Sequence, residues 1–296
     1  MKYKFILTLT FALGHFFLFG QEQPIKAYLD SASYYRLTGD TMEVYYLTKA
    51  IQLQPQNPTL YELRAYAKSY LQKESDPNYG HKEAIKDFDI AIKLSPKNSF
   101  YYEQRGYQKY LAGQFYQATK DYNKAIRLDR KNAGAYRKRG DVFWDFQNFP
   151  QAGEDYYRAS QLDTTSIYNL RKVGDCFYEL GNLRNAVQFY DQAISKAESR
   201  SYFDEVYSED YALSILYRAN SNGYMGKAKE AIKDYSSVIE YNEKFKGLID
   251  YTQEAYKFRG MAYLNIEKKE EGCKDLKMAQ SLGDKEAKEY IDIYCK

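Results

Sequence analysis

Small and aromatic residues recur along this chain at a fixed interval, between stretches of polar residues. The interval is 34 residues, and four columns keep it between Ser99 and Arg200. The columns are Gly106, Gly140 and Gly174; Ala118, Ala152 and Ala186; Tyr122, Tyr156 and Tyr190; and Ala125, Ala159 and Ala193. Apolar residues at helical spacing on both sides of a polar turn predict a pair of amphipathic helices in each period. The pattern therefore predicts one helical hairpin repeated along the chain, each packed on its neighbours.

This period, with small residues inside a helix–turn–helix pattern, resembles the tetratricopeptide repeat. The resemblance implies an all-α fold, a right-handed superhelical solenoid of about seven hairpins with a C-terminal capping helix. The repeats are expected at 24–57, 58–98, 99–132, 133–166, 167–200, 212–245 and 253–283, and the capping helix at 284–296. Residues 201–211 are expected to be an insertion that lengthens the flanking helices. A further insertion, Ser75 to His81, contains Pro and Gly and is expected to be a loop inside the second repeat.

A charged column runs beside the small residues. Arg precedes the small residue of the first helix in five repeats, and Asp precedes the second-helix aromatic residue or Leu in the same five. The pairs are Arg64 and Asp87, Arg105 and Asp121, Arg139 and Asp155, Arg218 and Asp234, and Arg259 and Asp275. Repeat five has Val173 and Phe189 instead. Because the two charges are present together and absent together, we predict an ion pair within each of the five hairpins and an apolar contact in repeat five.

Residues 1–20 have the pattern of an export signal. Lys2 and Lys4 precede a mostly apolar run from Phe5 to Phe19, and Gly20 follows. This run is too short for a transmembrane helix and is typical of a signal peptide, so we expect cleavage after Gly20. The signal and the Tyr- and Lys-rich composition are similar to those of exported Bacteroidota proteins. We therefore expect an exported protein of the periplasm or in peripheral association with the outer membrane, with no transmembrane segment.

Charge and residue usage argue against several classes of function. The 43 basic and 40 acidic residues leave a net charge of +3, so no strong field points to nucleic acid or to an anionic membrane. Once residues 1–20 are removed, His81 is the remaining histidine, which leaves no basis for a His-based triad or a multi-His metal site. The chain also lacks a phosphate-binding loop and zinc-ligand spacing. We expect no catalytic residues, no metal and no cofactor.

In the tetratricopeptide repeat family, the first helices line the concave face, where ligand peptides usually lie. On that geometry, aromatic and charged residues turn inward along the first helices. They are Tyr66, Tyr70, Tyr107, Tyr110, Trp144 and Tyr178, with Arg137, Lys138, Asp141, Arg171, Lys172 and Asp175. Aromatic rings supply contact area and Arg binds carboxylates or carbonyls, so this set suits an extended or helical segment of a partner. The alternative is that Arg137 with Asp141, and Arg171 with Asp175, are ordinary intrahelical pairs.

A clamp for C-terminal carboxylates, which some family members use, takes Asn where this chain has Asp141 and Asp175. We therefore do not expect that specialisation.

Three cysteines and two threonines complete the candidate residues. Cys273 and Cys295 flank the turn at Gly283 by similar helical lengths, so an antiparallel hairpin brings them opposite each other. In an oxidising compartment this favours a disulfide, with two buried free thiols as the alternative. Cys176 is expected to be a small buried residue. Thr41 and Thr164 follow Asp in predicted turns, in a pattern similar to O-glycosylation sites of exported Bacteroidota proteins.

The leading hypothesis is an exported, non-enzymatic scaffold or adaptor that binds a protein or peptide segment in its concave groove. The alternative is a constitutive subunit of a larger cell-envelope complex for secretion, motility or outer-membrane assembly. Such a subunit would contact its partners through the insertions and the convex faces. A third class, a carbohydrate-binding protein or an enzyme, has the least support in the sequence.

Overall fold

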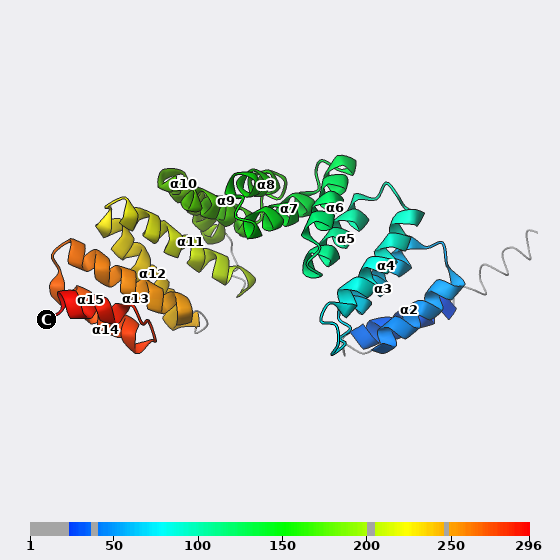
Figure 1. Ribbon diagram of the computed structural model, residues 1–296, viewed down its shortest axis with the longest axis horizontal. Coiled ribbons are helices and arrows are strands. Elements are labelled where there is room, and N and C mark those ends of the chain that lie inside the picture. The colour runs from blue at the N-terminus through cyan, green and yellow to red at the C-terminus, as the bar shows by residue number, and fades with distance from the viewer. Residues whose placement is uncertain (1–23, 37–40, 200–204, 246–248) are drawn as a thin grey trace, which may run out of the picture. The chain divides into compact units, whose positions relative to one another are not determined.

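The chain folds into helices that follow one another as antiparallel hairpins (Figure 1). The computed structural model describes residues 24–36, 41–199, 205–245 and 249–296, and every regular element within these ranges is an α-helix. This confirms the predicted all-α class. The expected signal peptide, residues 1–20, lies outside the described residues. The chain divides into two compact units, Met1–Val142 and Phe143–Lys296, each described by itself below.

The first unit is a stack of successive helices. After a helix over 24–36, they are α2 (Thr41–Leu53), α3 (Pro58–Ser69), α4 (Tyr79–Leu94), α5 (Ser99–Leu111), α6 (Phe115–Leu128) and most of α7 (Ala133–Asp145). From α2 to α6, each helix packs against the next one in the chain. This is the arrangement expected of a repeat protein, in which neighbours in sequence are neighbours in space.

The expected loop of the second repeat is shorter than predicted, because Tyr79, Gly80 and His81 form the first turn of α4. A Cβ atom at Gly80 would lie 2.6 Å from the carbonyl oxygens of Ser69 and Leu71. The glycine therefore permits a close approach of two backbones. The sequence interpretation of this Gly as a loop signal was wrong.

The second unit continues the same pattern. Its helices are α8 (Phe149–Leu162), α9 (Ile167–Glu179), α10 (Leu183–Glu198), α11 (Glu205–Tyr224), α12 (Ala228–Phe245), α13 (Ile249–Asn265), α14 (Lys269–Ser281) and α15 (Ala287–Tyr294). Successive helices pack together, and α11 also contacts α9 and α13. The first helices of the hairpins thus lie beside one another. Helix α11 begins at Glu205, so part of the insertion at 201–211 lengthens this helix, as predicted. Helix α13 begins at Ile249, so part of the stretch between the expected sixth and seventh repeats, 246–252, also extends a helix.

The repeated small residues let the two helices of a hairpin approach closely. A Cβ atom at Gly106 would lie 2.8 Å from Cε1 of Tyr122, and one at Gly174 would lie 2.6 Å from Cε1 of Tyr190. Both tyrosine side chains are completely buried. The glycine column therefore exists to make room for the aromatic ring of the partner helix, and it belongs to the core.

The predicted ion pairs are present in four hairpins. Each Arg uses two nitrogens to bind both carboxylate oxygens of its Asp, a bidentate geometry that fixes the register of the two helices. The pairs are Arg64 with Asp87, Arg105 with Asp121, Arg218 with Asp234 and Arg259 with Asp275, at 2.5–2.9 Å. Arg139 and Asp155 belong to different units, and their pair stays a prediction.

These four arginines and Arg139 make a further bond that the sequence analysis missed. In each case Nη1 reaches a polar side chain on the second helix of the preceding hairpin. The partners are Thr48 for Arg64, Asp89 for Arg105, Asn123 for Arg139, Asp191 for Arg218 and Ser236 for Arg259, at 2.5–3.1 Å. We call this arrangement the arginine staple, because one guanidinium joins three helices of two successive hairpins.

Repeat five replaces the staple with an apolar contact, as predicted. Val173 is 1% exposed and belongs to a core cluster with Phe177 and Phe189 packed against it. The Phe177 and Phe189 rings stack with centroids 5.5 Å apart, and Tyr157 meets Phe189 edge to face at 6.0 Å.

Glycines with positive φ close several of the hairpins. Gly113, Gly181 and Gly226 have φ of 71–75° in the turns after α5, α9 and α11. Gln147 and Glu267 take the same left-handed conformation, with φ of 55° and 63°, in the turns after α7 and α13. A side chain in this region is strained, so these two turns are less favourable than the glycine turns.

Candidate functional site

The charged residues expected beside the ligand groove in the first unit are engaged within the fold. Lys138 Nζ lies 2.6 Å from Glu103 Oε1 and 4.9 Å from the centroid of the Tyr107 ring. Burial lowers the pKa of Lys138, while Glu103 works in the opposite direction. Arg137 Nη1 binds Asp141 Oδ2 at 3.3 Å within one helix. The intrahelical pair, the alternative left open by the sequence, is therefore present.

The charged candidates of the second unit are buried still more deeply. Arg171 is 8% exposed and binds both Asp175, at 2.6 Å, and Asp210, at 2.7 Å. Lys172 Nζ lies 3.7 Å from Asp175. Burial raises the pKa of Asp175, against the attraction of Arg171 and Lys172. These charges hold α9 and α11 together.

The aromatic candidates pack mainly against rings of their own unit. Three make edge-to-face contacts with centroids 5.2–5.7 Å apart: Tyr66 with Phe88, Tyr110 with Phe115, and Trp144 with Phe149. Lys172 Nζ also lies 3.3 Å from the centroid of the Trp144 ring. Tyr70 is 81% exposed. The predicted track spans the boundary after Val142, so its continuity stays a prediction.

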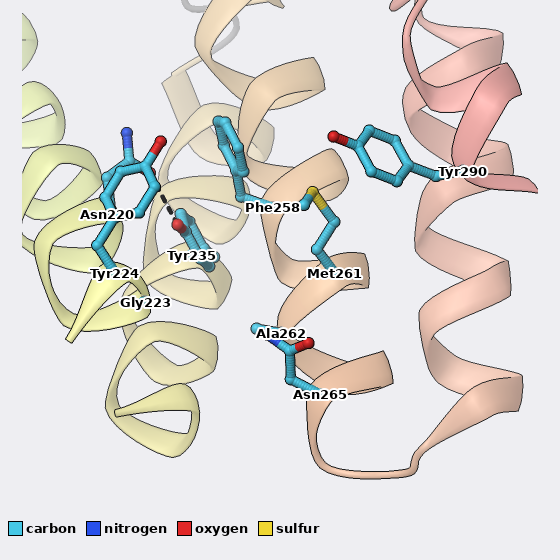
Figure 2. Close-up of a pocket in the computed structure, with 9 residues that line it drawn as sticks. All are labelled: Asn220, Gly223, Tyr224, Tyr235, Phe258, Met261, Ala262, Asn265 and Tyr290. Atoms are coloured by element: carbon cyan, nitrogen blue, oxygen red, sulfur yellow. Dashed lines mark hydrogen bonds between the residues drawn. The ribbon is translucent and has the colours of Figure 1, made fainter. Parts of the chain in front are cut away.

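In the second unit, a pocket opens beside α11 and α13, the first helices of the sixth and seventh hairpins (Figure 2). Its volume is about 310 Å³, within the range of small ligand sites. It is lined by Asn220, Gly223 and Tyr224 of α11, Tyr235 of α12, Phe258, Met261, Ala262 and Asn265 of α13, and Tyr290 of α15. Figure 2 shows Tyr290 pointing from α15 toward α13. Tyr224 is 68% exposed, so a large apolar ring is available to solvent at this pocket.

Buried hydrogen bonds orient the amide in the pocket. The Tyr235 hydroxyl donates to Asn220 Oδ1 at 2.7 Å, and Asn220 Nδ2 donates to Glu254 Oε1 at 3.2 Å. Phe258 stacks on Tyr235 with centroids 6.3 Å apart. Asn220 is 6% exposed, so its amide is held in one orientation before any ligand arrives.

Tyr178 extends the pocket along α9. Its ring lies 6.3 Å from that of Tyr224 and 5.7 Å from that of Tyr217. Burial raises the pKa of Tyr217 to about 12, so its hydroxyl stays neutral at physiological pH. Of the predicted groove residues, Tyr178 is the one that lies beside this pocket. We call the surface formed by Tyr178, Asn220, Tyr224, Met261, Asn265 and Tyr290 the inner groove.

The wall of the inner groove on α15 depends on a disulfide. Cys273 and Cys295, the two cysteines expected to pair, are joined with their Cα atoms 5.6 Å apart. Helix α15 has eight residues, and Ala287 is its one fully buried residue. A second pocket, of about 440 Å³, shares Met261, Asn265 and Tyr290 and adds Ile293 and Tyr294. An eight-residue helix with so little buried surface needs a covalent anchor to hold its position.

Sequence reasoning missed most of the inner groove, although a signal for it was present. Asn220 and Met261 follow the small residues Ala219 and Gly260, and so stand in the column of Asp141 and Asp175. The insertions before the sixth and seventh repeats break the 34-residue spacing and hide this relationship. Extending the columns through the insertions finds both residues.

The remaining candidate residues lie apart from the groove. Cys176 is buried, and burial raises the pKa of its thiol to about 12. Thr164 is exposed between α8 and α9, whereas Thr41 is the first residue of α2 and not part of a turn. His81 Nδ1 lies 2.9 Å from Gln108 Oε1 in the first unit.

The described part of the chain lacks two features. No three His, Cys, Asp or Glu side chains in it group as metal ligands. No described helix has the length and apolar character needed to cross a bilayer.

The hairpins and their repeated columns define a helical repeat protein, and the comparisons with known proteins specify which kind. The sequence model of the TPR repeat matches residues 106–145. Solved structures of tetratricopeptide repeat proteins share the fold, so the chain has the fold of such proteins, and residues 106–145 carry the sequence pattern of the repeat itself. No curated protein matches it in sequence.

Three similar structures show the extent of the likeness. The C-terminal part of a TPR repeat-containing protein from Cytophaga hutchinsonii has 19% identity and a TM-score of 0.67, covering 87% of this chain and 97% of that one. A tetratricopeptide repeat protein from Parabacteroides merdae has 20% identity and a TM-score of 0.56, covering 93% and 100%. YrrB, described as a TPR protein with an unusual peptide-binding site, has 18% identity and a TM-score of 0.57, covering 69% and 97%. At these identities the likeness concerns the fold alone.

Proposed function

We propose that this protein is an exported, non-catalytic adaptor that binds a segment of a partner protein in the inner groove. The observation that carries the proposal is an oriented, buried amide, Asn220, beside the exposed ring of Tyr224 and the apolar side chains of Met261 and Tyr290. A fixed amide can pair with a backbone peptide group, while the rings provide contact area. YrrB, with its peptide-binding site, supports the idea that this fold can present such a surface.

The proposed location rests on residues 1–20, whose pattern is that of an export signal. Removal of this segment leaves a chain that works in the periplasm or in peripheral association with the outer membrane.

Site-specific cross-linking in the native host tests the groove. A photoreactive phenylalanine replaces Tyr224 in one strain and Tyr116 in another, followed by irradiation and mass spectrometry. Tyr116 is a matched control because it is 69% exposed but lies on α6 in the first unit. We expect a discrete partner segment cross-linked at position 224 and no such product at position 116. Equal labelling at both positions would reject the groove as the binding site.

The second candidate function, a constitutive subunit of an envelope complex, predicts a different result. It is favoured by the helix extension at the start of α11, which adds residues outside the repeat period. A subunit held through its insertions would cross-link at Tyr79 or Tyr211 more strongly than at Tyr224. The same strains, with the photoreactive residue moved to these positions, therefore separate the two hypotheses.

A further inference from the structure

Another pocket of the second unit, separate from the two described above, lies where repeat five lacks the arginine staple. Its volume is about 480 Å³. Most of its wall is apolar and comes from α8, α9 and α10, including Phe149, Tyr157, Val173, Phe177 and Phe189. We call it the repeat-five pocket. It shares no lining residue with the inner groove.

Three columns that build the staple change together at this pocket. The Arg becomes Val173, its carboxylate partner becomes Phe189, and the polar partner on the preceding hairpin becomes Tyr157. Val173 is much shorter than Arg, so the space that a guanidinium crosses in the other hairpins is left open. The exchange of three polar positions for apolar ones makes that space hydrophobic.

A fourth column opens the pocket further. Position 153 is Gly, whereas the equivalent residues of the other repeats all carry a side chain: Ile85, Thr119, Val187, Ile232 and Cys273. A Cβ atom at Gly153 would lie 3.3 Å from Cβ of Cys176, so a larger residue there would fill the pocket floor. Glycine inside a helix is less favourable than any of these residues. Glycine at this position therefore lowers helix stability and leaves the cavity open.

The residue after Gly153 is acidic, whereas most other repeats have a basic residue at this position. Glu154 lines the pocket and is exposed, whereas the equivalent residues are Lys86, Lys120, Gln188, Lys233 and Lys274. Around an apolar cavity, this single carboxylate favours an occupant that carries a positive charge beside an apolar group. It disfavours fatty acids and other anionic amphiphiles, because their head group would lie next to a like charge.

We propose that the repeat-five pocket is a second docking site, which receives a large apolar side chain of a partner protein next to a Lys or Arg that pairs with Glu154. An anchor side chain in a concave apolar pocket, with a complementary charge at the rim, is the usual construction of an interface hot spot. Tyr157 and Leu180, which are 48% and 49% exposed at the edge of the pocket, enlarge the contact area.

A displayed library of random 12-residue peptides, selected on the full chain, tests this proposal. Individual peptides are then titrated by fluorescence polarisation against the wild type, Gly153→Val, Glu154→Lys and Tyr224→Ala. Gly153→Val fills the pocket with the residue that repeat five itself has in this column, Val187. Glu154→Lys changes an exposed residue and leaves the cavity unfilled. Circular dichroism verifies that each variant is folded.

We expect one class of peptides with an aromatic or large aliphatic residue near a Lys or Arg. Its affinity should fall at least about tenfold in Gly153→Val and about threefold in Glu154→Lys, and stay unchanged in Tyr224→Ala. If every selected peptide were sensitive to Tyr224→Ala and to neither Gly153→Val nor Glu154→Lys, the inner groove would be supported and the repeat-five pocket overturned.

Three other outcomes also overturn the proposal. The first is a selected class that binds Gly153→Val as well as the wild type. The second is a preference for acidic flanking residues, unchanged by Glu154→Lys. The third is a self-association, measured by sedimentation velocity, that Gly153→Val abolishes, because the occupant is then a second copy of this chain.

Discussion

The arginine staple of the sixth hairpin offers a sharp test of how these repeats are held in register. Arg218 binds both oxygens of Asp234 at 2.7 and 2.8 Å, and Asp191 of the preceding hairpin at 2.7 Å. We consider three variants: Arg218→Val, Asp234→Phe, and the two together. The double variant reproduces the residues that repeat five has in the same columns, Val173 and Phe189.

The expected magnitudes follow from burial. The Asp234 side chain is 8% exposed, so Arg218→Val leaves a nearly buried carboxylate without its partner. Loss of one member of a fully buried pair costs about 3–5 kcal/mol, and the 23% exposure of Arg218 reduces this to about 2–3 kcal/mol. Asp191 is 54% exposed and contributes less than about 1 kcal/mol. The double variant should lie within about 1 kcal/mol of the wild type, because an apolar pair of suitable volume replaces the ions.

Hydrogen exchange measured by mass spectrometry is the appropriate assay, because repeat arrays do not unfold in a single all-or-none step. It gives the opening free energy of the α11 and α12 segments separately from the other helices. Arg36→Met serves as the control: Arg36 is 55% exposed in its ion pair, so the cost should stay below about 1 kcal/mol.

The staple would be refuted as a coupled unit if the two single variants and the double variant were additive. A loss below about 0.5 kcal/mol for Arg218→Val would likewise show that the pair is worth no more than an exposed one.

Four further predictions follow from other features. Gln147→Gly should stabilise the second unit by about 0.5–1 kcal/mol, measured by hydrogen exchange of the α8 amides, because it relieves a left-handed residue with φ of 55°. Gly80→Ala should destabilise the first unit by at least about 1–3 kcal/mol, seen as a lower thermal midpoint, because its Cβ would meet backbone oxygens at 2.6 Å. Replacing Cys273 and Cys295 by Ser should remove about 3 kcal/mol from the anchoring of α15, since the bond closes a loop of sequence separation 22, and exchange of the α15 amides should accelerate. If Thr164 carries a glycan in the native host, the intact mass should exceed the sequence mass, and Thr164→Ala should abolish the difference; an unmodified mass rejects the site.

The parts of the fold that depend on repetition could be predicted from the sequence. In successive hairpins, the same Gly–Tyr contact and the same Arg–Asp pair recur at a fixed spacing. The periodicity of these residues therefore predicts which residues contact each other. The joint absence of Arg and Asp in repeat five likewise implied the apolar cluster that contains Val173 and against which Phe189 packs.

The candidate site was harder to predict, because periodicity identifies a face of a helix and says little about which residues on it remain available. Arg171 and Asp175 were expected to face a ligand, but Asp210 lies within the extension at the start of α11 and pairs with Arg171. That contact spans 39 residues and belongs to no column. The role of Gly80 was missed for a different reason. A glycine in a sequence can mark either a turn or a close approach of two backbones.

The two surfaces proposed for binding share one property. At each of them, the residue at a repeated position differs in chemical character from its equivalents in other repeats. In the inner groove, the acidic column of Asp141 and Asp175 becomes Asn220 and then Met261, so the repeat no longer has a carboxylate to neutralise. In the repeat-five pocket, the staple becomes apolar, while Gly153 and Glu154 depart from their columns on α8, the second helix of the preceding hairpin. A single exchange of an ion pair for an apolar pair is nearly neutral for stability and needs no functional reason. A glycine at position 153 and a carboxylate at position 154 are not required by that exchange, and the glycine lowers helix stability. Their coincidence at one place therefore favours binding over neutral variation of the repeat.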